Sequence, residues 1–113
     1  MSRKFFAAII FALVLGIFAG AAFADDSYFV REEAARRNMH LISVEQAKSI
    51  AEGRLNSRNV IFKDVDLDNE ADDYPNGTNF RPVYQIECLS GGQEYDIDID
   101  AVTGQVLKFK LDD

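Results

Sequence analysis

The side chains best suited to chemistry are the acidic residues between positions 64 and 73. Asp64, Asp66 and Asp68 have the spacing that opens an EF-hand calcium loop. That loop also needs glycine at its sixth position and glutamate at its twelfth, where this chain has Asn69 and Pro75. Because the three aspartates also alternate with apolar residues, as they would along a half-buried strand, the sequence excludes an EF-hand.

The acidic segment that follows is a weaker candidate for metal binding. Carboxylate oxygens are the ligands that Ca²⁺ prefers, and four carboxylates lie close together in the sequence: Asp68, Glu70, Asp72 and Asp73. The closeness of these four carboxylates in the sequence is the only evidence for a metal site here. We therefore expect no cofactor, with Ca²⁺ bound by these four residues as the alternative.

The chain has one cysteine and one histidine, which limits nucleophilic and metal chemistry. Cys88 shares a side of its predicted strand with Tyr84 and Ile86, so we predict a buried, inert thiol. His40 precedes the main predicted helix and has no second ligand or nucleophile nearby in the sequence. Without a disulfide framework, a zinc cage or a glycine-rich phosphate loop, the chain is not expected to be an enzyme.

The charge of the chain narrows the class of partner. The 113 residues include 12 basic and 19 acidic residues, for a net charge of −7. Residues 1–24 contain no acidic residue, so residues 25–113 carry a net charge of −9 and are only 39% hydrophobic. This is enough apolar material for one small domain. The charge argues against nucleic acid and anionic membrane surfaces as partners.

The first 24 residues are predicted to be a signal peptide. Two basic residues precede the apolar run Phe5–Phe18, and Ala22-Phe23-Ala24 provides a small-x-small cleavage pattern. A membrane anchor is the alternative, but two glycines and several alanines weaken the second half of the run. No cysteine directly follows the apolar run, so the chain is not expected to be a lipoprotein. We predict cleavage after Ala24, contact with the membrane only during export, and a periplasmic or secreted mature chain.

Residues 25–40 form an N-terminal extension, predicted as a short helix or a partly disordered segment. Ser27 is a candidate N-cap, and Glu32 and Glu33 precede Arg36 and Arg37 at helical spacing. Apolar residues are few here, so the sequence leaves the order of this segment open.

A firmer helix is predicted to begin after Ser43. Ser43 and Gln46 have the spacing of a capping box. The apolar residues of this segment recur at helical spacing and should face a core: Val44, Ala47, Ile50, Ala51 and Leu55. The exit loop is predicted at residues 56–59.

Beyond this helix the spacing of the apolar residues changes from the 3.6 residues of a helix to the two residues of a strand, which predicts four antiparallel strands. They are centred on residues 64–68, 83–89, 95–100 and 106–111, with an acidic loop at 69–79 and a Ser90-Gly91-Gly92 hairpin. The expected fold class is therefore α+β, with one main helix packed on one face of an antiparallel meander. The other sheet face should be open to solvent or to a partner.

The last two strands have a predicted register. Opposite charges and apolar residues would face each other in the pairs Asp96–Lys110, Asp98–Lys108, Ile97–Phe109 and Ile99–Leu107. The remaining aspartate, Asp100, is predicted to accept hydrogen bonds from Val102 or Thr103 in the following turn, with Gly104 at positive φ.

Three segments in this order resemble the PepSY domain family. They are Ile42–Ala47 with Ile50-Ala51, the strand Pro82–Glu87, and Tyr95–Leu107 with its Asp-Ala-Val-Thr-Gly turn. The resemblance covers Leu41 to Leu111 and implies a PepSY-like domain over residues 41–113. Such domains occur in propeptides of secreted metallopeptidases and as free-standing exported modules, and they have no catalytic residues to carry over. The resemblance therefore implies an exported binding module that modulates or inhibits an extracytoplasmic peptidase.

The surfaces expected to contact that partner are inferred from exposure alone. They are Val83, Gln85 and Glu87 on the open sheet face, Ser90, Gly91 and Gly92 in the hairpin, and the acidic loop at 69–79. A protein partner such as a secreted or periplasmic peptidase is expected, with the chain itself a monomer or a weak dimer through an exposed strand edge. The alternative function is an acidic protein that binds or senses divalent cations such as Ca²⁺ in the periplasm.

Overall fold

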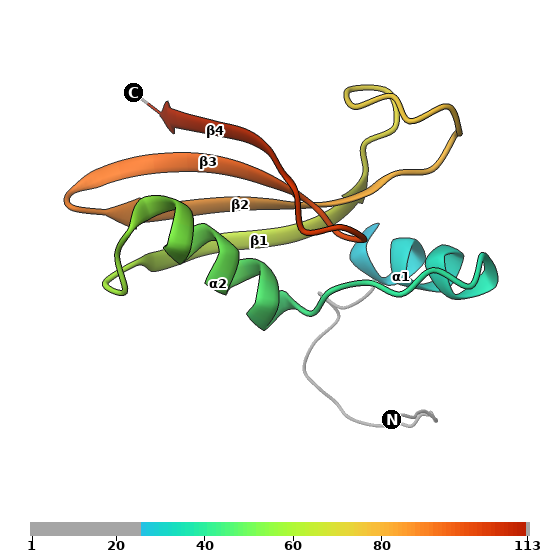
Figure 1. The fold of residues 1–113 in the computed structure, drawn as a ribbon, viewed down its shortest axis with the longest axis horizontal. Helices are drawn as coiled ribbons and strands as arrows, with labels where there is room; N and C mark the ends of the chain where they lie inside the picture. Colours follow the sequence, from blue (N-terminus) through green and yellow to red (C-terminus); the bar gives the residue numbers. More distant parts are fainter. Residues whose placement is uncertain (1–25, 113) are drawn as a thin grey trace.

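A computed structural model describes residues 26–112 of the chain (Figure 1). The elements are helices α1 (Asp26–Arg36) and α2 (Val44–Leu55), followed by strands β1 (Ile61–Asn69), β2 (Pro82–Ser90), β3 (Gln93–Asp100) and β4 (Val106–Asp112). The predicted signal peptide and its cleavage site lie outside the described residues.

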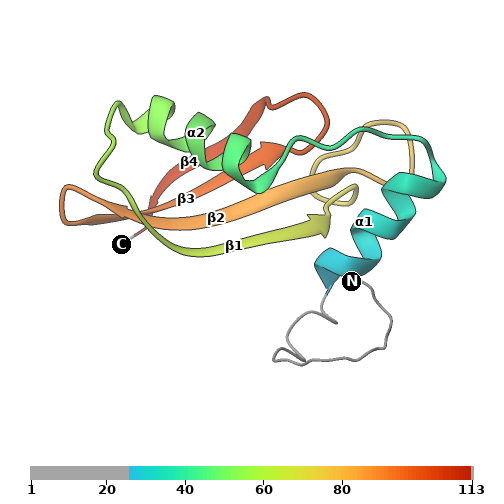
Figure 2. The ribbon, with the colours of Figure 1, turned by 90° about the horizontal axis from the view of Figure 1, so that it is seen from below.

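The four strands form one antiparallel sheet in the order β1-β2-β3-β4. Helix α2 lies along one face of this sheet (Figure 2), where Ala47 and Ala51 join Ile86, Ile97 and other strand residues in the core. The predicted α+β fold, with one main helix on a meander, is confirmed. The face opposite α2 is called the open face below.

Helix α2 begins and ends as its sequence predicts. The Ser43 side chain accepts a hydrogen bond from the Gln46 amide at 3.0 Å, and the Gln46 side chain accepts one from the Ser43 amide at 2.8 Å. Both bonds satisfy amides at the helix N-terminus that have no partner within the helix. Asn56 ends the helix in the left-handed conformation, with φ 54°.

Helix α1 is formed, and its predicted ion pairs are confirmed. Glu33 lies 2.6 Å from both Arg36 and Arg37. The prediction for Ser27 is wrong, because the helix begins at Asp26 and Ser27 lies within its first turn. The Ser27 hydroxyl instead accepts a hydrogen bond from the Leu67 amide at 3.1 Å and lies 3.3 Å from the Leu67 carbonyl oxygen. The helix is thereby docked on the edge of β1.

The predicted register of the last two strands is confirmed for three of its four pairs. Asp96 faces Lys110, Ile97 faces Phe109 and Asp98 faces Lys108. Ile99, however, lies opposite Val106 and not Leu107, because the register shifts by one residue between Asp98 and Ile99. This irregularity places Val106 against the core, although simple alternation predicts it on the open face.

The turn between β3 and β4 follows its prediction closely. Asp100 accepts hydrogen bonds from the amides of both Val102 and Thr103, at 2.8 and 2.9 Å. Gly104 has φ 81°, which disfavours residues with a side chain, and a Cβ added there would lie 3.2 Å from Ile50 Cδ1 of α2. The turn therefore needs glycine both for its backbone and for its contact with the helix.

Candidate functional site

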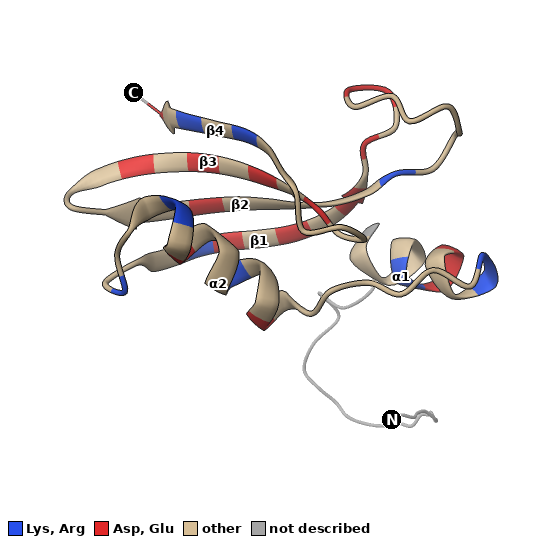
Figure 3. Ribbon diagram, in the orientation of Figure 1, with Lys and Arg blue, Asp and Glu red and all other residues tan. Residues whose placement is uncertain are grey.

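The open face carries rows of acidic residues that run across the strands. The strand registers place Asp64 of β1 opposite Glu87 of β2, and Glu87 opposite Asp96 of β3. In the adjacent row, Gln85 lies between Asp66 and Asp98. Figure 3 shows this concentration of acidic residues on β1, β2 and β3, with basic residues on β4.

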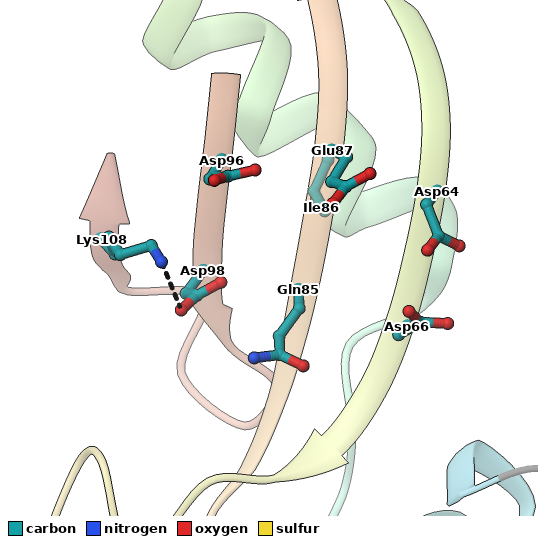
Figure 4. Close-up of a pocket in the computed structure, with 8 residues that line it drawn as sticks. All are labelled: Asp64, Asp66, Gln85, Ile86, Glu87, Asp96, Asp98 and Lys108. Carbon is teal, nitrogen blue, oxygen red and sulfur yellow. Dashed lines mark ion pairs between the residues drawn. The ribbon is translucent and has the colours of Figure 1, made fainter. Parts of the chain in front are cut away.

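These side chains surround a hollow of about 230 Å³ (Figure 4). Its lining comes from all four strands and comprises Asp64, Asp66, Gln85, Ile86, Glu87, Asp96, Asp98 and Lys108. Five of these eight residues are carboxylates and one is basic. Helix α2 lies behind the sheet in this view, so it leaves the hollow uncovered.

Three of these carboxylates form no close ion pair within the described part of the chain, although Lys110 lies opposite Asp96 on β4. No hydrogen bond or ion pair found in residues 26–112 involves the side chains of Asp64, Glu87 or Asp96. Lys63 of β1 forms its ion pair with Glu94, at 3.0 Å, and Glu87 interacts with it only through a weaker electrostatic attraction. Because like charges directly opposite each other destabilise a sheet, the position of Glu87 between Asp64 and Asp96 costs the fold stability.

Asp98 is the most enclosed carboxylate of the hollow, at 5% exposure. Its Oδ2 accepts a hydrogen bond from the Tyr74 hydroxyl at 2.7 Å and lies 4.0 Å from Lys108 Nζ. The cross-strand partner Lys108 was predictable from the strand alternation. Tyr74 was not, because nothing in the acidic loop indicates that its hydroxyl returns to the sheet.

The loop between β1 and β2 is tied to the open face by a second contact. Arg81 donates a hydrogen bond from Nε to Asp100 Oδ2 at 2.9 Å, and Asp100 is itself 5% exposed. Burial alone would raise the pKa of Asp100, but the hydrogen bonds from Thr103, Val102 and Arg81 outweigh it and lower the pKa. The aspartate therefore stays ionised beside its arginine.

The position of Val83 corrects one predicted contact. Val83 was expected to be exposed on the open face, but it is 0% exposed. It lies between Asp68 and Asp100 in the strand register, close to Arg81, at the end of the face where the loop returns to the sheet. The alternation of side chains along a strand predicts on which face of the sheet a residue lies, but it does not predict whether another part of the chain covers that face. Val83 is therefore unavailable as a surface contact.

A comparison with protein-family models identifies the chain. Residues 41–110 match the model of the peptidase propeptide and YPEB domain, PepSY. The chain belongs to the PepSY family. The match includes α2 and nearly all of the sheet and leaves α1 outside it. No curated protein and no solved structure matches the chain significantly.

The remaining predicted contacts lie on two different parts of the PepSY domain. Gln85 and Glu87 line the hollow. Gly91 and Gly92 form the exposed tip between β2 and β3, at φ 59° and 79°, next to the paired residue Ser90. The hairpin tip and the hollow are therefore separate surfaces.

The four residues considered for Ca²⁺ do not form a metal-binding group. Within residues 26–112, no three histidine, cysteine, aspartate or glutamate side chains are placed to hold a metal ion. Asp72 is exposed, and Asp68 lies on β1. Glu70 is hydrogen-bonded to Asp73, and burial, this bond and the charges of Asp73, Asp68 and Asp98 raise its pKa to about 7. Near neutral pH, Glu70 is therefore protonated in a substantial fraction of molecules.

Cys88 lies on the side of β2 that faces α2 and is 0% exposed. Burial is the main cause that raises the pKa of its thiol, and the charge of Asp96 adds to it. The predicted burial of this cysteine is confirmed. No helix within the described residues is long and apolar enough to cross a membrane.

Proposed function

We propose that this PepSY domain is an exported, non-catalytic binding module that modulates or inhibits an extracytoplasmic peptidase. The family model is named for peptidase propeptides, and it covers α2 and most of the sheet. The apolar run and cleavage pattern at the N-terminus support export.

The observation that carries the proposal is the unpaired acidic row on the open face. Asp64 and Asp96 both lie opposite Glu87, which costs the sheet stability, and none of the three forms a close ion pair within residues 26–112. Exposed polar residues that cost a fold stability are characteristic of binding surfaces. The open face is therefore the proposed contact with the peptidase, and the hairpin tip at Gly91 and Gly92 is a second candidate.

The direct test is an inhibition assay with residues 25–113. Purified protein is added to the periplasmic or secreted fraction of the source organism, and hydrolysis of a casein substrate is measured against protein concentration. We expect a saturable change in peptidase activity and recovery of the same peptidase on immobilised protein. Unchanged activity at all concentrations, together with no captured peptidase, would overturn the proposal.

A matched pair of variants shows whether the open face is responsible. Asp64→Asn with Glu87→Gln removes two negative charges from the open face. Glu45→Gln with Glu52→Gln removes two from α2, on the other side of the sheet. The effect on peptidase activity should weaken only in the first double variant, since both have the same net charge.

A further inference from the structure

We infer that the open face binds an extended, lysine- or arginine-bearing segment of the partner, with basic side chains at alternate positions. This inference rests on the proposed function, because it specifies which part of a partner protein the open face recognises. It is argued from the charge of the face, its hollow and the spacing of its carboxylates.

The charge of the hollow selects a cationic occupant. Asp64 and Glu87 are exposed, Asp96 is half-buried, and all three line the same hollow without an ion pair among residues 26–112. A positively charged side chain placed among them would relieve their mutual repulsion and gain charge-assisted hydrogen bonds.

The enclosed position of Asp98 gives the hollow depth as well as charge. Its side chain lines the hollow although the residue is only 5% exposed. Its Oδ2 is approached by Tyr74 from the side of the loop and by Lys108 from the side of β4. A cationic group that enters the hollow from above β2 would therefore meet a carboxylate held in a fixed position.

The same charges exclude other occupants of this face. A second copy of the chain that presents its own open face would set carboxylates against carboxylates, which disfavours self-association there. Nucleic acid carries the same sign of charge as the face. A bare divalent ion is disfavoured, because no group of three carboxylates within residues 26–112 is placed to hold one.

The spacing of the carboxylates selects an extended segment. Asp64 and Asp66 are two residues apart on β1, as Asp96 and Asp98 are on β3. Two residues of a strand span about 6.7 Å, and alternate side chains of any extended segment have the same separation. A segment that runs along the strands above β2 can therefore place successive alternate basic residues between these two acidic pairs.

The flanks of the hollow position the segment over β1, β2 and β3. Lys108 lines the hollow on the β4 side and would repel basic side chains there. At the far end of the face, Lys63 and Glu94 form an ion pair at 3.0 Å, next to the exposed Ile61. At the other end lies Tyr74, bonded to Asp98. The acidic surface is thus bounded on three sides.

Calorimetric titration of residues 25–113 with synthetic peptides tests the inference. The probe alternates lysine and threonine over seven residues. One control peptide has glutamate in place of lysine, and a second has the same lysines grouped together. We expect binding of the alternating lysine peptide, weakening as salt is raised from 50 to 500 mM, no binding of the glutamate peptide, and weaker binding of the grouped peptide.

The two double variants locate the binding. Asp64→Asn with Glu87→Gln should weaken binding of the alternating lysine peptide about fivefold or more, whereas Glu45→Gln with Glu52→Gln should change it less than twofold. Circular dichroism confirms that both variants are folded. Equal weakening in both variants, or no binding of the lysine peptide at millimolar concentration, would overturn the inference.

The results separate this inference from the proposed function. If the protein inhibits a peptidase but binds no lysine peptide, the inference that the open face binds a basic segment is wrong, and the proposed role in modulating a peptidase stands. If it binds the lysine peptide at the open face and leaves every peptidase unaffected, the open face does bind basic segments, and the proposal that the partner is a peptidase is wrong.

Discussion

Glu87 lies between two other carboxylates in adjacent strands, Asp64 on one side and Asp96 on the other. Replacement of Glu87 by glutamine removes both repulsions, together with a weaker attraction to Lys63, and preserves the shape of the side chain. We expect Glu87→Gln to raise the free energy of unfolding by a few tenths to about 1 kcal/mol, measured by urea denaturation at low salt. Asp72→Asn, at an exposed position of the loop, should leave it nearly unchanged. A less stable Glu87→Gln protein would contradict the view that this row is strained.

Asp100 is the carboxylate on which the fold depends most. It accepts hydrogen bonds from two turn amides and from Arg81 while almost fully buried. We expect Asp100→Ala to cost about 2 to 4 kcal/mol in thermal or urea unfolding, because it leaves two turn amides without partners and removes the carboxylate that pairs with the largely enclosed Arg81. The exposed Asp72→Ala should cost less than about 0.5 kcal/mol. Similar costs for the two variants would contradict the role of Asp100.

Glu70 should make stability depend on pH in the direction opposite to most carboxylates. Its pKa rises from 4.5 to about 7 in the folded chain, so its contribution is fully present below pH 4.5 and is lost as pH rises through 7. Glu70→Gln mimics the protonated form. We therefore expect the stability of this variant relative to wild type to increase between pH 5 and pH 8. An equal difference at both pH values would contradict the raised pKa.

At the scale of elements, α1 protects an otherwise open strand edge. The Ser27 hydroxyl occupies both the amide and the carbonyl of Leu67 on β1. Ser27→Ala should cost about 1 kcal/mol and accelerate hydrogen exchange at the Leu67 amide, measured by NMR. The control Ser49→Ala, on an exposed position of α2, should leave that amide protected. Unchanged protection in Ser27→Ala would show that α1 does not depend on this contact.

The elements predicted best from the sequence are those set by local signals. The capping box at Ser43 lies within four residues and needs no tertiary information. The aspartate turn before Gly104 is equally local, since Asp100 and its turn partners are adjacent in the chain. Strand alternation likewise predicted which acidic residues share the open face.

The predictions that failed depended on contacts between distant parts of the chain. Ser27 resembles an N-cap in the sequence, yet its partner Leu67 is 40 residues away. Val83 has the parity of an exposed residue, but the loop returns to the sheet beside it. The hydrogen bond from Tyr74 to Asp98 spans 24 residues. The alternation of polar and apolar residues carries information about a single strand, whereas each of these contacts joins two distant segments of the chain.

For the whole molecule, the distribution of charge matters more than its total. Residues 25–113 have a net charge of −9, and part of that charge is neutralised in ion pairs such as Arg81–Asp100 and Lys63–Glu94. The part without ion pairs includes the row of Asp64, Glu87 and Asp96 on the open face. An acidic PepSY domain thus presents one face suited to a basic segment of a partner protein.

The most direct test of this account is the inhibition assay in which wild type and the two double variants are compared at matched concentration. The account predicts that wild type and Glu45→Gln with Glu52→Gln change the activity of the same extracytoplasmic peptidase equally. It also predicts that Asp64→Asn with Glu87→Gln is at least several-fold weaker, since it removes two carboxylates from the open face. Equal potency of all three proteins, or no effect of any of them, would contradict the account.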